Sequence, residues 1–322
     1  MRKSILVTIL TVLTSLTAAS PALASTATAH PLRLPPVIRG TAPAMHPEGF
    51  AWDPTRGAFL VGSVKHGTVS VVRPDGSTRT LVSDPHLDST FGVHVDVRRG
   101  RFLVAYADLG LGDRTGGASG IGIFDLRTGR TLRLIDFGRL VNDFALDPDG
   151  NAYVTDPGGD TLYTVDTRGR FSVLVTDPRF AGTGFALNGI VWHRGGYLIV
   201  VKYDTGKLFR VPVRHPERFT EVTLDRPLVG GDGITLRPDG ALVVSTNKLA
   251  SSGEDAEQVL RSPNGWRTAH QVQRIAPWPD PAPTAVTVTP SGTYALSGRL
   301  DILGSGGTSD EFILRKLPLS AL

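Results

Sequence analysis

The stretch DFALDPDGNAYVTD, residues 143–156, has large apolar side chains at its second and fourth positions, Phe144 and Leu146, then the turn DPDG and a second apolar run. An alternation with a period of two predicts β-strands, and a polar turn with glycine between two such runs predicts a hairpin. Asn142 and Asp143 stand where the first strand begins, although both residue types are poor strand formers. Strand propensity therefore does not explain why these two residues occur here.

The same hairpin pattern recurs along the chain. Similar segments are separated by 43, 51, 46, 44 and 52 residues and begin at Gly49, Gly92, Asp143, Gly189, Gly233 and Ala285. Each has apolar residues at its second and fourth positions, then a polar turn and a second apolar strand, and further short strands such as GTVSVVRP lie between the hairpins. Four strands in each repeat of about 40–50 residues predict a β-propeller. We therefore expect an all-β, six-bladed β-propeller with four-stranded blades.

Both ends of the chain bear on this architecture. The last repeat ends with EFILRKLPL and is one strand short, so the stretch LRLPPVIRG, residues 32–40, is expected to supply that strand and close the ring. Before it, Arg2 and Lys3, an apolar run and an A-x-A site ending at Ala24 predict a signal peptide over residues 1–24. The apolar run is too short to span a membrane. We expect one propeller domain over residues 25–322, secreted to the extracellular space or the periplasm, with no membrane span.

The composition excludes several classes of function. The chain of 322 residues has no cysteine, which rules out disulfides, thiol catalysis and zinc–thiolate sites. Its net charge of +4 is dispersed without a basic run, so nucleic acid is not an expected partner. No G-x-S-x-G motif indicates a serine hydrolase.

The residues that precede the six hairpins would form a ring at one mouth of the central channel, because the first strand of each blade lines that channel. They are Glu48, Phe91, Asn142, Asn188, Asp232 and Thr284. The turn preference of Asn and Asp could account for one or two of them, but not for a glutamate. Two carboxylates and two amide carbonyls directed at one point suit calcium, which takes about 6–8 oxygen ligands.

Four motifs carry a family resemblance. HPEGFAWDP, NDFALDPDGNAYVTD, LNGIVWH and GGDGITLRPDG resemble, in order and spacing, the senescence marker protein/gluconolactonase superfamily of six-bladed propellers, from about Pro47 to Ser297. The resemblance implies one axial catalytic Ca²⁺ held by Glu48, Asn188 and Asp232, with Asn142 contacting the metal or the substrate; other divalent ions are alternatives. It also implies that Asp232 is a candidate general base or nucleophile.

A second set of residues is expected around the substrate. Residues just past each second strand should rim the pocket, namely Lys65, Asp108, Asp156, Lys202, Asn247 and Arg299, unless they form only a solvated loop edge. Phe91, Asp143 and Thr284 complete the candidate pocket residues. Gluconolactonase-type members carry an arginine where this chain has Leu140, and Phe91 lies in the ring, so an apolar lactone or ester fits better than a sugar lactone. The glycine-rich stretch GLGDRTGGASGIG, residues 110–122, reads as a long loop that could cover the pocket.

These observations favour a secreted calcium-dependent hydrolase of lactones or related esters, whose substrate is a small molecule with a carbonyl polarised by the ion. The alternative is a non-catalytic NHL-like propeller that binds a protein or a glycan. A lyase-like relative would be expected to lack the four oxygen-bearing ring residues. The fold supports all three classes equally, so the site must decide between them.

Overall fold

The computed structural model describes residues 33–319. The predicted signal peptide, residues 1–24, and its cleavage site near Ala24 lie outside the described residues. Residues 33–319 belong to one compact unit and fold almost entirely into β-strands. Within residues 33–319, no helix is long and apolar enough to cross a membrane.

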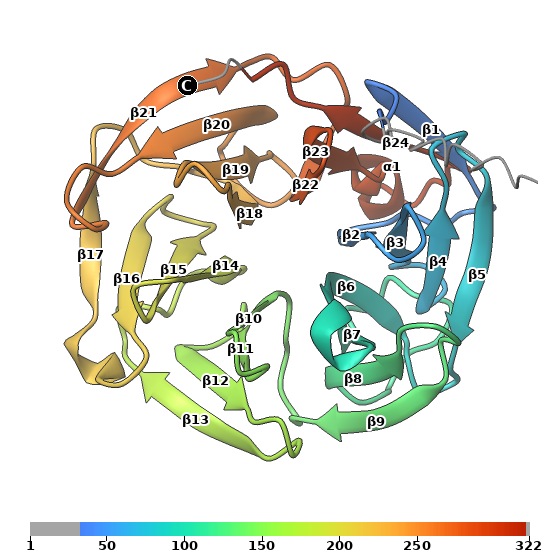
Figure 1. The fold of residues 1–322 in the computed structure, drawn as a ribbon, viewed down its shortest axis with the longest axis horizontal. Helices are drawn as coiled ribbons and strands as arrows, with labels where there is room; N and C mark the ends of the chain where they lie inside the picture. Colours follow the sequence, from blue (N-terminus) through green and yellow to red (C-terminus); the bar gives the residue numbers. More distant parts are fainter. Residues whose placement is uncertain (1–32, 320–322) are drawn as a thin grey trace, which may run out of the picture. The chain divides into compact units, whose positions relative to one another are not determined.

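The strands form four-stranded sheets arranged around a central axis, with β2, β6, β10, β14, β18 and β22 nearest to it (Figure 1). The first sheet contains β2 (Phe50–Asp53), β3 (Ala58–Gly62), β4 (Thr68–Val72) and β5 (Thr78–Ser83). The second contains β6 (Ser89–Asp96), β7 (Arg101–Ala107), β8 (Gly120–Asp125) and β9 (Thr131–Asp136). The third contains β10 (Phe144–Leu146), β11 (Ala152–Thr155), β12 (Thr161–Val165) and β13 (Phe171–Thr176).

An eight-stranded sheet follows, made of two four-stranded halves. One half contains β14 (Leu187–His193), β15 (Tyr197–Lys202), β16 (Leu208–Pro212) and β17 (Thr220–Leu224). The other contains β18 (Gly231–Leu236), β19 (Leu242–Thr246), β20 (Ala256–Arg261) and β21 (Thr268–Ile275). A short parallel pairing between β17 and β21 joins the halves into one sheet, and side chains of both halves pack in one hydrophobic cluster.

The last sheet combines both ends of the described chain. It contains β22 (Pro283–Thr289), β23 (Gly292–Ser297), β24 (Glu311–Lys316) and β1 (Val37–Thr41). β1 runs antiparallel to β24, with Val37 opposite Arg315 and Thr41 opposite Glu311. The helical elements are short: η1 (Val97–Arg99), η2 (Pro216–Arg218) and α1 (Leu300–Gly304). The all-β class and the propeller architecture predicted from the repeats are confirmed.

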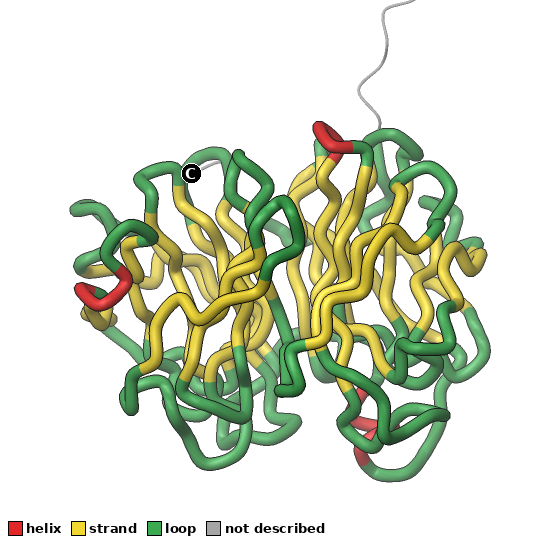
Figure 2. Tube along the Cα trace, turned by 90° about the horizontal axis from the view of Figure 1, so that it is seen from below, coloured by secondary structure: helices red, strands yellow, loops and turns green. Residues whose placement is uncertain are grey.

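The hydrophobic core lies between neighbouring sheets. Leu60 and Val71 of the first sheet pack in one cluster with Phe102 and Val104 of the second, and similar clusters fill the other gaps. Figure 2 shows the sheets from the side, with loops gathered at two opposite ends. Burial of apolar faces between sheets, rather than disulfides, therefore holds the ring together.

Glycines let the inner strands approach one another. A Cβ atom at Gly49 would lie 2.2 Å from the carbonyl oxygen of Phe91, and one at Gly189 would lie 2.2 Å from the carbonyl oxygen of Asp232. Real Cβ contacts essentially never fall below 3.0 Å, so these positions accept only glycine at the observed spacing. Each of these glycines directly follows a predicted oxygen-bearing ring residue. The close packing therefore brings the ring residues toward the axis.

We expect Gly189→Ala to lower the free energy of unfolding by about 1–3 kcal/mol, because the added methyl group must push against backbone atoms of the next sheet. The control is Gly304→Ala, at a position where an added Cβ would meet nothing within 4 Å. That change should alter stability by no more than about 0.5 kcal/mol. Denaturant unfolding measures both. Equal stability of the two variants would show that the inner strands can separate at no cost.

Candidate metal and substrate site

Glu48, Asn142, Asn188 and Asp232 line one cavity at the axis. Glu48 and Asn142 lie just before β2 and β10, and Asn188 and Asp232 lie near the starts of β14 and β18. All four are buried, with at most 8% of each residue exposed. The structure thus brings together the four oxygen-bearing side chains that the repeat alignment placed in one ring.

Three oxygen atoms of this group have no partner. The Oδ1 atoms of Asn142, Asn188 and Asp232 are buried and accept no hydrogen bond from residues 33–319. Leaving a buried acceptor unpaired costs about 1–3 kcal/mol. A cation that prefers carboxylate and amide oxygens, as Ca²⁺ does, would satisfy all three at once. The donor set therefore fits such an ion.

The amides are essential to this fit. Residues 33–319 contain no group of three or more His, Cys, Asp and Glu side chains that could hold a metal. Glu48 and Asp232 supply two carboxylates, and only the two asparagines raise the number of side-chain ligands to four. A hard cation bound by oxygen is consistent with this set, whereas zinc would prefer His or Cys.

Burial also makes both carboxylates hard to ionise. It raises the pKa of Asp232 to about 7, with further repulsion from Asp143, against the lowering effect of hydrogen bonds from Asn247 and Asn188. Burial is also the main reason that the pKa of Glu48 lies well above its ordinary value, and the charges of Asp232 and Asp143 raise it further. The two buried carboxylates repel each other, and a bound cation would relieve this repulsion.

Asn247 orients Asp232 from behind. Its Nδ2 donates to Oδ2 of Asp232 at 2.7 Å and to the carbonyl oxygen of Pro283 at 2.9 Å. The hydroxyl of Tyr203 in turn donates to Oδ1 of Asn247 at 2.6 Å and accepts from the amide of Ala250 at 3.0 Å. Asn247 is fully buried, so it supports Asp232 rather than rimming the pocket as predicted.

The walls of the cavity are apolar. The space, of about 190 Å³, is lined beyond the four polar residues by Val64, Phe91, Leu109, Leu111, Phe185, Tyr203, Leu249, Ala250, Leu300 and Gly304. Phe91 lies where the ring prediction placed it. The other wall residues come from connections between strands and from α1, and the sequence analysis did not identify them. For Tyr203 the available signal was its position directly after Lys202, at the end of β15.

The six residues expected from the sequence to rim the pocket do not form the wall of the cavity itself. None of Lys65, Asp108, Asp156, Lys202, Asn247 and Arg299 is among the residues that line the cavity. Apart from Asn247, each has a polar partner. Lys65 pairs with Asp113 in a loop of another sheet, whereas the other four have partners two residues away: Lys202 pairs with Asp204 and Arg299 with Asp301, while Asp108 accepts from the amide of Gly110 and Asp156 from the amide of Gly158. Leucine and phenylalanine side chains form much of the cavity wall.

Asp143 and Thr284 face a second hollow behind the ring. This space, of about 120 Å³, shares the four oxygen-bearing residues with the first cavity and continues along the inner strands. The hydroxyl of Thr284 donates to the carbonyl oxygen of Glu48 at 2.7 Å, and Oδ1 of Asp143 lies 3.5 Å from Nε2 of His94. Both residues therefore line the axial channel and not the apolar cavity.

Comparison with known proteins places the fold. No protein-family model and no curated protein sequence matches the chain. The Malassezia sympodialis allergen Mala s 1 is similar in structure, with a TM-score of 0.71 and 21% identity over 88% of this chain and 96% of the allergen. A luciferin-regenerating enzyme is similar with a TM-score of 0.60 and 14% identity, over 89% of this chain and 97% of the enzyme. A protein provisionally named a gluconolactonase is similar with a TM-score of 0.59 and 16% identity, over 89% of this chain and 94% of that protein. At the level of the fold, the resemblance to gluconolactonase-like propellers is confirmed.

We expect the chelated protein to lose stability as pH rises from about 4 through about 7. The folded state holds protons on Asp232 and Glu48 that the unfolded chain releases near ordinary carboxyl pKa values. Their contribution is therefore complete at low pH and is lost as pH rises through the raised pKa. Asp232→Asn should flatten this dependence, because the amide does not titrate. Urea unfolding in the presence of chelator measures the free energy of unfolding of the wild type and of Asp232→Asn at each pH. The same dependence on pH in both proteins would contradict the prediction.

Proposed function

We propose that this protein is an exported, calcium-dependent hydrolase of apolar lactones or related esters. The observation that carries the proposal is the set of three buried, unpaired oxygen atoms, on Asn142, Asn188 and Asp232, that share an apolar cavity with Glu48. Unpaired buried acceptors are unfavourable in a binding scaffold and useful in a cation site. The predicted signal peptide over residues 1–24 supports export.

The proposal includes a six-bladed ring. The four separate sheets and the two halves of the eight-stranded sheet give six four-stranded sets, which we take as blades. The antiparallel pairing of β1 with β24 supports closure of the last blade by the N-terminal strand. A closed ring keeps the inner strands, and with them the four oxygen-bearing side chains, at fixed positions around the axis.

Glu48, Asn142, Asn188 and Asp232 would hold the ion, with other oxygen-preferring divalent cations as alternatives. Bound calcium would supply Lewis-acid polarisation of a carbonyl oxygen. Within the chain, Asn247 holds Oδ2 of Asp232 and leaves Oδ1 bare. Asp232 is thus the candidate to accept a proton from water or to attack the carbonyl. A carboxylate beside a cation is a weaker base, so we assign Asp232 first as a ligand and second as the base or nucleophile.

The apolar walls favour one substrate class. Phe91, Leu111 and Leu249 would surround the organic part of a lactone or ester and keep water from the site. Leu140, which stands where gluconolactonase-type members have an arginine, packs against the hydrophobic core. No cationic side chain is among the cavity-lining residues to grip a sugar acid. The names of two structural neighbours, a gluconolactonase and a luciferin-regenerating enzyme, are compatible with a small-molecule substrate.

The deciding experiment is pH-stat hydrolysis of a panel of lactones and aryl esters by the mature protein, with calcium and after chelation. We expect turnover that disappears with chelator and returns with calcium. Glu48→Gln should lower kcat/KM by at least about 100-fold, because it removes one of two charged ligands. The control Glu221→Gln neutralises an exposed acid and should leave turnover unchanged. Absence of turnover on the whole panel would favour the NHL-like propeller that binds a protein or a glycan.

Asn247 gives a second test of the site. We expect Asn247→Ala to weaken calcium binding or turnover by about 10–100-fold, because Asp232 loses the hydrogen bond that orients it. Calorimetric titration with Ca²⁺ measures the affinity directly. Asn151→Ala is the control, since Asn151 also donates to a carboxylate but in a surface turn. Equal calcium affinity and turnover in both variants would remove Asn247 from the site.

A further inference from the structure

One wall of the apolar cavity belongs to a long connection. Residues 108–119, here called the cavity loop, join β7 to β8 and contribute Leu109 and Leu111 to the lining. The loop contains four glycines and no strand or helix of its own. Within the loop, Asp108 accepts hydrogen bonds from the amides of Gly110 and Gly116. A glycine-rich segment still has many accessible conformations, so contacts with other parts of the structure are needed to fix its position relative to the cavity.

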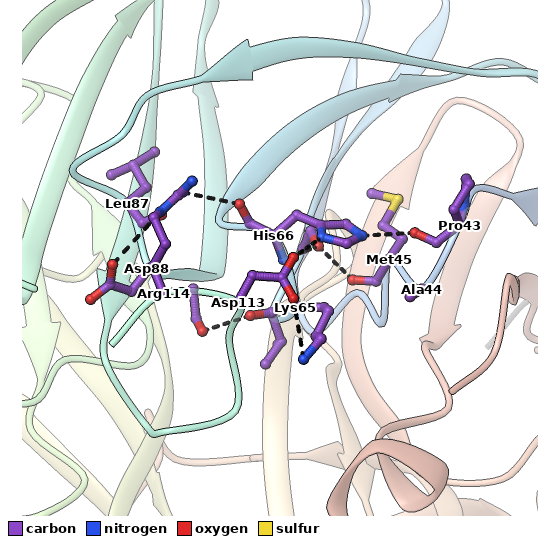
Figure 3. A network of polar contacts seen from close by, with 12 residues as sticks. Pro43, Ala44, Met45, Lys65, His66, Leu87, Asp88, Asp113 and Arg114 are labelled. Carbon is purple, nitrogen blue, oxygen red and sulfur yellow. Dashed lines mark hydrogen bonds and ion pairs between the residues drawn. The ribbon is translucent and has the colours of Figure 1, made fainter. Parts of the chain in front are cut away.

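Asp113 provides one such set of contacts (Figure 3). Its carboxylate lies 3.2 Å from Nζ of Lys65 and 2.6 Å from Nδ1 of His66, and its amide donates to the carbonyl oxygen of Lys65 at 2.8 Å. Nε2 of His66 lies 2.8 Å from the carbonyl oxygen of Pro43. Asp113 thus ties the cavity loop to the connection between β3 and β4 in the neighbouring sheet and, through His66, to the segment before β2.

Arg114 provides a second set (Figure 3). Its guanidinium donates to the carbonyl oxygens of Leu87 and His66 and lies 3.9 Å from the carboxylate of Asp88. The other carboxylate oxygen of Asp88 accepts from the amide of Gly117 at 2.7 Å. Asp113 and Arg114 come two and three residues after Leu111 in the sequence. Their partners lie in the first sheet or just before the start of the second.

We propose that the cavity loop is a specificity-determining wall, and that Asp113 is the residue that positions it. This inference rests on the proposed function in that the cavity is taken to receive the substrate. Leu111 is only two residues from Asp113, so loss of the Asp113 contacts lets this wall recede. A bulky apolar substituent then loses contact with the wall, whereas a small acyl group close to the ring does not.

The exposure of these groups makes the idea testable. About half of the Asp113 side chain is exposed, and about a third of each of Lys65 and His66. Ion pairs this exposed contribute little to overall stability. Asp113→Asn should therefore loosen the cavity loop without unfolding the protein. The matched control is Glu221→Gln, which breaks the equally exposed pair with Lys207, across the β16–β17 pair and away from the cavity.

The first measurement is amide hydrogen exchange. In Asp113→Asn, peptides that cover residues 108–119 should exchange at least about threefold faster than in the wild type, and in Asp113→Asn/Arg114→Gln faster still. Glu221→Gln should leave these peptides unchanged. Leu111→Ala, which keeps the contacts and removes part of the wall, should also leave their exchange unchanged. Unaltered exchange in the double variant would overturn the proposal.

The second measurement is specificity. For aryl esters with long acyl chains, Asp113→Asn and Leu111→Ala should raise KM about threefold to fivefold with kcat nearly constant. For aryl acetates KM should stay within about twofold. If the wild type hydrolyses nothing, the proposed function fails, and the wall is then tested by Nile red binding, whose Kd should rise by the same factor in both variants. Faster exchange without a change in chain-length preference or Nile red affinity would overturn the proposal.

Discussion

The structure depends on the close approach of the inner strands around the axis. At Gly49 and Gly189 the next sheet comes so near that no Cβ fits. The residue before each of these glycines then has its side chain at the axis, where it lines the cavity. The packing that closes the ring is therefore also what gathers Glu48 and Asn188 at one point. The backbone geometry of the fold and the position of the site have a single cause.

This packing has an electrostatic consequence. Two buried carboxylates repel each other, and burial shifts the pKa of Asp232 to about 7. Three buried oxygen atoms nearby lack donors. A bound divalent cation would offset the repulsion between the carboxylates and would give each buried oxygen atom a partner. The same desolvation that penalises the ion-free site thus strengthens its interaction with a cation.

The sequence was informative wherever the repeat constrained the residue. The period-two hairpins predicted the all-β propeller, and Asn142 and Asp232 could be placed in one ring because each directly precedes a hairpin of the repeat. The repeat does not constrain the connections between strands. Lys65 and Lys202 form ion pairs and do not line the cavity, while Leu111 lines it from a long loop that contacts another sheet through Asp113. Asn247 was found, but its role required its burial to be known.

Under the proposed function, the oxygen-bearing residues that would carry the chemistry and the leucines that would select the substrate lie on elements of different rigidity. The oxygen-bearing residues lie at or just before the starts of inner strands, and these strands cannot shift without opening the core between sheets. Leu109 and Leu111 stand on a loop held by partly exposed charges, which salt screens and a single substitution can release. A change in the loop can alter which apolar group fits without disturbing the carboxylates or the amides. Under the proposed function, this separation would let a rigid propeller carry one reaction centre and still admit different substrates.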